Sequence, residues 1–223
     1  MPTGKAFRFS SVPALDVRKS AITKASAEQL AAAKERARKR RISLFGPFSG
    51  ANPAPWVGKV LGKHKLRIIT GGRMGPVDEI VKEAIGHGAK NISVIVEPWA
   101  KGFNPNIPGK ARNITARGND RMGTRPLQER LGILQTHKIK GYLFLYPGAK
   151  TFSGTMLELQ AIVNAHTLEG ITSKQWSRPI ILIGKEWKPV FEQIKSDYAS
   201  KWNSLKDNLI IVENEEQLDR ALQ

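Results

Sequence analysis

Short apolar runs alternate with helical segments along most of this 223-residue chain, and glycine-rich turns join them at three places. The runs are four or five residues long, as in Tyr142 to Tyr146, and each is bounded by turn-forming residues. In the segment that follows that run, apolar residues recur at helical spacing, as at Met156, Leu159 and Ile162. Such alternation predicts an α/β fold with a doubly wound, mostly parallel sheet, whose ligands bind at the carboxyl ends of the strands.

The same pattern predicts the positions of the individual elements. Candidate strands are residues 42–45, 66–70, 92–96, 142–146, 180–183 and 209–212. Helices are expected around residues 56–61, from the residue after Gly75 to Gly86, and from residues 153–155 onward. Asn214 with Gln217 gives a capping-box start for a last helix. These elements are expected to form one domain over residues 42–223.

The turn after residues 142–146 carries the most specific signal. Gly148 follows that strand, and a helix is expected to begin at Ser153, Gly154 and Thr155. Free backbone N–H groups and the positive end of the helix dipole bind phosphate at such a start. Glu158 lies about one turn further on. Alternatively, the turn only caps a helix, and Glu158 favours its positive end.

Two other glycine-rich turns follow predicted strands. The first contains Gly46 and Ser49, and the second contains Gly71, Gly72 and Gly75. Because the carboxyl ends of parallel strands meet at one edge of a sheet, all three turns are expected to converge there. These residues are therefore candidates for binding the phosphate or the rest of a substrate.

The formal net charge of the chain is +17, and residues 1–41 hold eleven basic and three acidic residues. Such a balance favours polyanionic partners, meaning nucleic acid or an anionic membrane surface. A solvated tail that only aids solubility is the alternative. We expect RNA, DNA or a ribonucleoprotein as the partner. The candidate nucleic-acid-binding residues are Lys34, Arg36, Arg38, Lys39, Arg40 and Arg41.

The basic N-terminal extension, residues 1–41, is predicted to combine an arm and a helix. Residues 1–25 lack apolar periodicity, whereas Ser26 with Gln29 starts a capping box, so a helix is expected over 26–41. The extension has no apolar signal-peptide core, although its composition also suits an organellar targeting segment. We expect a cytoplasmic protein, or alternatively one in an organellar matrix or another nucleic-acid-rich compartment.

Composition argues against several other classes of protein. The chain has no cysteine, and its four histidines show no metal-ligand spacing, so we expect no structural metal. No apolar run approaches the roughly 20 residues of a membrane helix, so no membrane span is expected. A long loop is expected from Glu97 to Thr124, and its basic residues leave three roles open: binding substrate phosphate, binding nucleic acid, or forming plain surface.

Together these turns resemble the Lonely Guy family, the cytokinin-activating nucleotide phosphoribohydrolases, within a broader superfamily of Rossmann-like nucleotide-binding proteins. The similarity covers roughly residues 42–222. The family's signature Pro-Gly-Gly-x-Gly-Thr-x-x-Glu is matched by Pro147-Gly148 and by Gly154-Thr155 with Glu158. Its Met-x-x-Arg-Lys element is matched by residues 122–125, which end in Arg125.

The resemblance implies hydrolysis of the N-glycosidic bond of a nucleoside 5′-monophosphate, without a cofactor, by a homodimer. Gly154 and Thr155 would hold the 5′-phosphate, and Arg125 and Glu158 would be the catalytic pair. A carboxylate suits this chemistry because it stabilises an oxocarbenium-like sugar and orients or deprotonates water. Arg125 would clamp phosphate or stabilise charge near the leaving base; its alternative is an ion pair with Glu129 on a helix surface.

Two departures from the family pattern bear on activity. Pro126 stands where the family has the lysine of its Met-x-x-Arg-Lys element, and residues 149–152 lengthen the signature turn. The alternative function is therefore a catalytically altered nucleotide-binding fold, serving an RNA or DNA assembly as a structural or sensor protein through the basic extension. A single-stranded DNA binder of the DNA-processing type is a related possibility, since such proteins also use a Gly-Gly-Arg turn.

Overall fold

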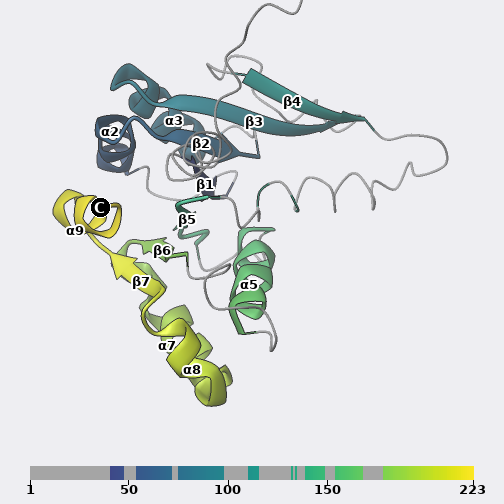
Figure 1. The fold of residues 1–223 in the computed structure, drawn as a ribbon, viewed down its shortest axis with the longest axis vertical. Coiled ribbons are helices and arrows are strands. Elements are labelled where there is room, and N and C mark those ends of the chain that lie inside the picture. The colour runs from purple at the N-terminus through teal and green to yellow at the C-terminus, as the bar shows by residue number, and fades with distance from the viewer. Residues whose placement is uncertain are drawn as a thin grey trace, which may run out of the picture.

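The computed structural model describes most of the predicted α/β domain (Figure 1). The described residues are 41–47, 54–71, 75–97, 110–115, 132, 134, 139–148, 154–167 and 178–223, with the backbone alone described for 92–97 and 110–115. The predicted arm and residues 26–40 of the predicted helix lie outside them. Arg41, predicted as the last residue of that helix, is instead the first residue of a strand.

Seven described strands form one sheet in the order β4-β3-β2-β1-β5-β6-β7. Their bounds are β1 Arg41–Phe45, β2 Arg67–Thr70, β3 Lys90–Glu97, β4 Lys110–Thr115, β5 Gly141–Leu145, β6 Ile180–Ile183 and β7 Leu209–Val212. All the neighbouring strands are parallel. The predicted doubly wound α/β fold is confirmed, and the sheet is parallel throughout the described strands.

The six strands predicted from the sequence are all present, with ends that differ by two residues at most. The loop predicted from Glu97 to Thr124 is wrong at residues 110–115, which form β4. This strand pairs with β3 alone, at the edge of the sheet. Because an edge strand is held by backbone pairing on one side, it needs no apolar run, and its polar sequence gave no strand signal.

Alternate residues of the central strands enter two separate apolar cores, one on each face of the sheet. Ile42 and Leu44 of β1 belong to one core, and Phe45 belongs to the other. Every residue of β5 is buried. Since helices cover both faces, the strands are apolar on both sides, which explains why their sequences are continuous apolar runs.

One face is covered by α2 (Pro55–Lys63), α3 (Pro76–Gly86) and α9 (Glu215–Ala221), as Figure 1 shows. Two glycines let α2 approach α3 closely: a Cβ on Gly58 would lie 2.5 Å from the carbonyl oxygen of Ile80, and one on Gly62 would lie 2.8 Å from that of Ala84. The predicted cap of α9 is confirmed, because the Asn214 side chain accepts a hydrogen bond from the backbone N–H of Gln217 at 3.0 Å.

The other face is covered by α5 (Gly154–Thr167), α7 (Lys188–Asp197) and α8 (Trp202–Leu205), with the short 3-10 turns η2 (Lys185–Trp187) and η3 (Ala199–Lys201) between them. Trp187 is fully buried, and its Nε1 donates to the carbonyl oxygen of Phe144 at 3.2 Å. It thereby fixes the C-terminal helices against β5. None of the described helices is both long and apolar enough to cross a membrane.

Candidate functional site

The strand order reverses between β1 and β5, and the chain leaves these two neighbours toward opposite faces of the sheet. After β1 it continues into α2 on one face, and after β5 it continues into α5 on the other. In doubly wound sheets, this divergence opens a crevice for ligands at the carboxyl ends of the strands.

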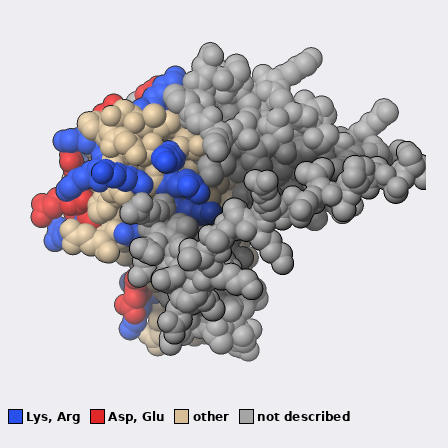
Figure 2. All heavy atoms as spheres, turned by 45° about the horizontal axis from the view of Figure 1, so that its top comes forward, with Lys and Arg blue, Asp and Glu red and all other residues tan. Residues whose placement is uncertain are grey.

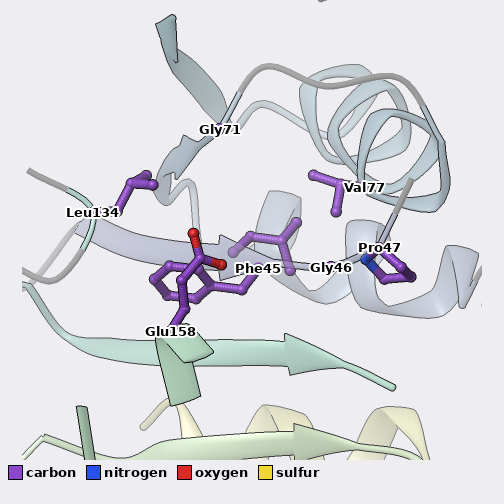
Figure 3. A pocket seen from close by; sticks show the side chains of 8 residues that line it. Phe45, Gly46, Pro47, Gly71, Val77, Leu134 and Glu158 are labelled. Atoms are coloured by element: carbon purple, nitrogen blue, oxygen red, sulfur yellow. The ribbon is translucent and has the colours of Figure 1, made fainter. Parts of the chain in front are cut away.

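A hollow of about 350 Å³, including the solvent at its mouth, opens at the carboxyl ends of β1 and β2 (Figure 3). The residues that line it are Leu44, Phe45, Gly46, Pro47, Gly71, Val77, Leu134 and Glu158. Three predicted site residues from distant parts of the sequence, Gly46, Gly71 and Glu158, thus meet at one place. Of the three predicted turns, the first two contribute Gly46 and Gly71 to the lining, and the helix after the third contributes Glu158.

Glu158 brings a carboxylate into the hollow. It is the fifth residue of α5, which begins at Gly154 as the sequence predicts, and it is half-buried. Figure 3 shows its side chain extending from α5 toward the carboxyl end of β1. The other described residues of the lining are glycine, proline or apolar. Among these lining residues, Glu158 therefore supplies the charge.

Gly46 has a packing role at this site. A Cβ there would lie 2.6 Å from Cγ2 of Val77 and 3.0 Å from Cδ1 of Leu145. These distances are shorter than a van der Waals contact, so any side chain would push α3 away from the end of β1. The glycine is therefore required by the contact between β1 and α3, whether or not a ligand approaches it.

The starts of α3 and α5 differ in their suitability for phosphate. Gly75 is the N-cap of α3, with φ of 122°, and Asp78 and Glu79 occupy the first turn. These carboxylates already take the favourable place for negative charge. The first turn of α5 holds no acidic residue. A Cβ built on Gly154 would meet no described atom within 4 Å beyond its chain neighbours and its own helix backbone. Of these two helix starts, that of α5 has no carboxylate in the place that favours negative charge.

Several predicted residues do not line the hollow. Gly75, Gly148, Gly154 and Thr155 are described but lie outside its lining, and Thr155 is buried, with 3% of its surface exposed. Arg41 lies at the opposite end of β1. The predicted residues that lie outside the described part of the chain are Arg125, Ser49, Gly72, Ser153, Lys34, Arg36, Arg38, Lys39 and Arg40. The pairing of Arg125 with Glu158 therefore stays a prediction.

Leu134 is a lining residue that the sequence did not indicate. It lies before β5 and is held beside β1, because the buried hydroxyl of Ser43 donates to its carbonyl oxygen at 2.6 Å. The available signal was Ser43 itself, a hydroxyl within an apolar strand, which needs an acceptor when buried. Such a signal indicates that an acceptor exists but does not say which residue supplies it.

His166, near the end of α5, has a structural environment. Its Nδ1 lies 2.8 Å from the carbonyl oxygen of Ile162, and its Nε2 lies 3.1 Å from that of Arg178. Burial lowers the pKa of this imidazole, although both carbonyl contacts act to raise it. The ring also packs edge-on against Tyr142, whose phenol has a pKa raised by burial. These contacts join α5 to the sheet, away from the lining of the hollow.

The sequence matches no family model and no curated protein. Among solved structures, the fold is similar to that of the molybdenum cofactor binding protein of the phototrophic bacterium Rippkaea orientalis, with a TM-score of 0.54 and 17% identity over 81% of this chain and 93% of that one. The molybdenum cofactor carrier protein of Chlamydomonas reinhardtii gives 0.49, with 18% identity over 82% and 97% of the two chains.

DNA processing protein A (DprA) from Streptococcus pneumoniae gives a TM-score of 0.50 and 14% identity over 82% of this chain. The match covers 62% of that chain, so this protein spans less than two thirds of its length. At these identities, the likenesses to DprA and to the Rippkaea orientalis protein show a shared Rossmann-like fold. The resemblance to the Lonely Guy family stays a prediction.

Proposed function

We propose that the hollow binds a nucleoside 5′-monophosphate and that the chain hydrolyses its N-glycosidic bond, as the resemblance to the Lonely Guy family implies. The observation that carries this proposal is the convergence of Gly46, Gly71 and Glu158 at the crevice where the strand order reverses. Folds of this kind bind nucleotides at that crevice. The apolar and glycine residues of the lining can pack against a sugar and a base, and the single carboxylate, that of Glu158, lies where it can act on the bond between them.

The start of α5 supports a phosphate-binding role for Gly154 and Thr155. The first N–H groups of a helix have no partner within the helix, and its dipole favours negative charge. No acidic side chain competes in the first turn of α5. Beyond the chain neighbours and the helix backbone, no described atom lies within 4 Å of the position of a Cβ on Gly154, so a ligand could approach there. With the phosphate there, the ribose would extend toward Glu158, one turn further along the helix.

The proposed reaction uses Glu158 as a general base. The oxygen of a water molecule bonds to C1′ of the ribose while the C1′–N bond breaks, and the electron pair of that bond leaves with the base. Glu158 accepts the proton that the water loses and stabilises the positive charge that develops on the sugar. The leaving base takes up a proton from solvent. The products are the free base and ribose 5-phosphate.

Two further parts of the proposal concern residues and contacts beyond the described part of the chain. Arg125 would clamp the phosphate or stabilise charge at the leaving base, because its fork of donors matches an anion. Arg125→Ala is then expected to weaken nucleotide binding, the rate, or both. A homodimer is the expected assembly, and light scattering of the purified protein measures it.

The test of the hydrolase uses the full-length protein with AMP, GMP, IMP, CMP and UMP, and chromatography to detect the free base. Glu158→Gln keeps the side-chain shape but removes the proton acceptor, so base release should fall at least about 100-fold. Nucleotide binding, measured by calorimetry, should persist. Glu192→Gln is the matched control, since Glu192 is an exposed residue of α7 outside the hollow, and it should keep the wild-type rate.

Two outcomes would contradict parts of this proposal. Binding without base release from any monophosphate would show that the hydrolase is wrong and leave a nucleotide-binding site. Equal rates in the wild type and Glu158→Gln would exclude Glu158 as the base. The same titration should include the molybdenum cofactor, because the Rippkaea orientalis protein of similar fold binds it.

A second function, association with nucleic acid, is supported by the net charge of +17 and by the similarity of fold to a DNA processing protein. Phosphate contacts release counterions, so affinity for single-stranded RNA or DNA should fall steeply between 50 and 200 mM salt. Fluorescence anisotropy with labelled oligonucleotides measures this dependence. Lack of binding at 50 mM salt would contradict this function without affecting the hydrolase.

A further inference from the structure

Basic side chains line the edge of the sheet opposite the hollow. Arg41, Arg67 and Lys90 are the first residues of β1, β2 and β3, and they lie side by side in the strand register. Gly141 of β5 pairs with Ile42 of β1. The residues before them, Lys140 and Arg41, therefore also lie side by side. Arg178 follows in the same register, two residues before β6. We call these five residues the basic row.

The basic row is a regular feature of the sheet. Side chains of residues that pair in register on parallel strands leave the sheet on the same face. The N–H of Lys140 donates to the carbonyl oxygen of Arg41 at 2.6 Å, so the pairing of β1 and β5 extends to these residues at the edge of the sheet. Adjacent strands lie about 4.8 Å apart, so the row extends over roughly 19 Å. The corresponding position before β7 is Asp207, and the row therefore ends at Arg178.

Much of this charge is not compensated by the described carboxylates. Within the described part of the chain, no carboxylate oxygen lies within 4.0 Å of a side-chain nitrogen of Arg41, Arg67, Lys90 or Arg178. Figure 2 shows Lys and Arg gathered across the described surface in that view, with Asp and Glu mainly toward its left margin.

One nitrogen in each of two guanidinium groups of the row also lacks an acceptor among the described residues. The Nε atoms of Arg41 and Arg178 are buried and donate no hydrogen bond within the described residues. A buried donor without an acceptor costs free energy. An anion bound at this edge would reduce the repulsion between neighbouring cations.

Lys65, two residues before Arg67, adds a further cation near the row. Its backbone is in the left-handed conformation, which lysine disfavours. Helices α2 and α3 end in the same motif, in which Lys65 N–H donates to Gly62 at 2.7 Å and Gly88 N–H donates to Ile85 at 3.0 Å. The left-handed residue of this motif is usually glycine, as at Gly88, with φ of 95°, but α2 has Lys65, with φ of 49°. The chain keeps a lysine where glycine suits the backbone better.

We infer that the basic row, flanked by Lys65, is a binding surface for single-stranded nucleic acid, contacted through its backbone phosphates. This inference rests on the second proposed function and assigns a surface to it. A line of cations attracts the line of phosphates in one strand. Residues 34–40, five of which are basic, run directly into Arg41, so the charge continues along the chain.

A membrane is a less suitable partner for this edge. Surfaces that bind membranes combine cations with exposed large apolar side chains that enter the lipid. Among the described residues, Leu157, in the first turn of α5, is the one large apolar side chain that is exposed. This turn lies at the carboxyl edge of the sheet, away from the basic row.

The test measures binding of labelled 20-nucleotide single strands, one DNA and one RNA, to the full-length protein at several salt concentrations. Contacts of Arg41, Arg67, Lys90 and Arg178 with four phosphates would give a slope of log affinity against log salt of about −2.8. The double variant Arg67→Gln with Lys90→Gln removes two contacts, so the slope should flatten by about 1.4, and affinity at 50 mM salt should fall at least about 10-fold.

Two controls isolate the position of the charge. Lys185→Gln with Lys188→Gln makes the same change in net charge after β6, at the first residues of η2 and α7 on the carboxyl edge, and should keep the wild-type slope. Arg67→Lys with Lys90→Arg retains both cations and should bind as the wild type does. That result would show that binding depends on positive charge at these two positions and not on the identity of the basic residue.

Three outcomes would overturn the inference. Equal losses in the row variant and in the carboxyl-edge control would show attraction by net charge alone. Absence of binding by the wild type would overturn the second proposed function as well, so the two failures are distinguishable. Tighter binding to phosphatidylserine vesicles than to either oligonucleotide, with the same dependence on Arg67 and Lys90, would assign the row to a membrane.

Discussion

The two edges of the sheet are built from the same strands but carry opposite surface chemistry. At the carboxyl edge, β1 and β2 end in the glycines Gly46 and Gly71, and these border a hollow that holds one carboxylate. At the amino edge, the same strands begin with Arg41 and Arg67, and the basic row extends across five strands. Among the described residues, one edge holds a hollow lined by a single charged side chain, and the other edge carries the five cations of the basic row.

The helices account for part of this difference. In a parallel α/β fold, helices run opposite to the strands, so their amino ends lie at the carboxyl edge of the sheet and their carboxyl ends at the amino edge. Helix dipoles therefore favour anions at the first edge and cations at the second. The polarity of the fold thus suits a phosphate near α5 and a basic row at the other end.

The largest expected effect on stability is at the carboxyl edge. Gly46→Ala places a methyl group against Val77 and Leu145, so the free energy of unfolding should fall by about 1–3 kcal/mol. Gly154→Ala is the matched control, because its Cβ meets no atom of the described residues, and alanine favours helix by up to about 1 kcal/mol. Urea denaturation measures both.

The same pair of variants tests which glycine serves the ligand. If phosphate binds at the start of α5, Gly154→Ala should weaken nucleotide binding while stability is kept. Unchanged nucleotide affinity in Gly154→Ala would move the phosphate away from α5. A stable Gly46→Ala protein would show that α3 yields easily and that Gly46 is not required for packing.

A smaller effect is expected at the amino edge. Lys65→Gly removes the penalty of a left-handed lysine, so stability should rise by about 1 kcal/mol. The reverse change, Gly88→Ala in the equivalent position after α3, should lower it by about as much. The basic row predicts that Lys65→Gly also weakens binding of single strands. A more stable variant with full affinity would remove Lys65 from the proposed surface.

The smallest effect concerns Asp219, an acid on α9 beside the end of α2. Lys63, at 2.9 Å, and His64, at 2.7 Å, lower the pKa of this carboxyl below its ordinary value of 3.8. The contact therefore stabilises the fold above about pH 3.8 and is lost as the pH falls through the lowered pKa of the folded state. Thermal unfolding from pH 7 to 2.5 should show a smaller drop for Asp219→Asn than for the wild type. Equal drops would show that these contacts are too exposed to contribute.

Much of the fold followed from local patterns in the sequence. The strands at 180–183 and 209–212 and the start of α5 match the predictions because apolar runs and glycine turns reflect burial and backbone geometry directly. Strand β4 was missed because pairing with β3, and not its own side chains, holds it. Part of the site was predictable for the same reason: Gly46, Gly71 and Glu158 stand out as turn or helix-start residues.

The sequence by itself determined the order of strands and helices, the glycine turns, and a helix that carries Glu158 one turn from its start. It also determined the excess of positive charge. The tertiary structure alone decided that Leu134 joins the lining, that Gly46 serves the contact with α3, and that five scattered basic residues form one row. The physical reason is that periodicity and turn chemistry act between near neighbours, whereas strand register and packing bring together residues that no local pattern relates.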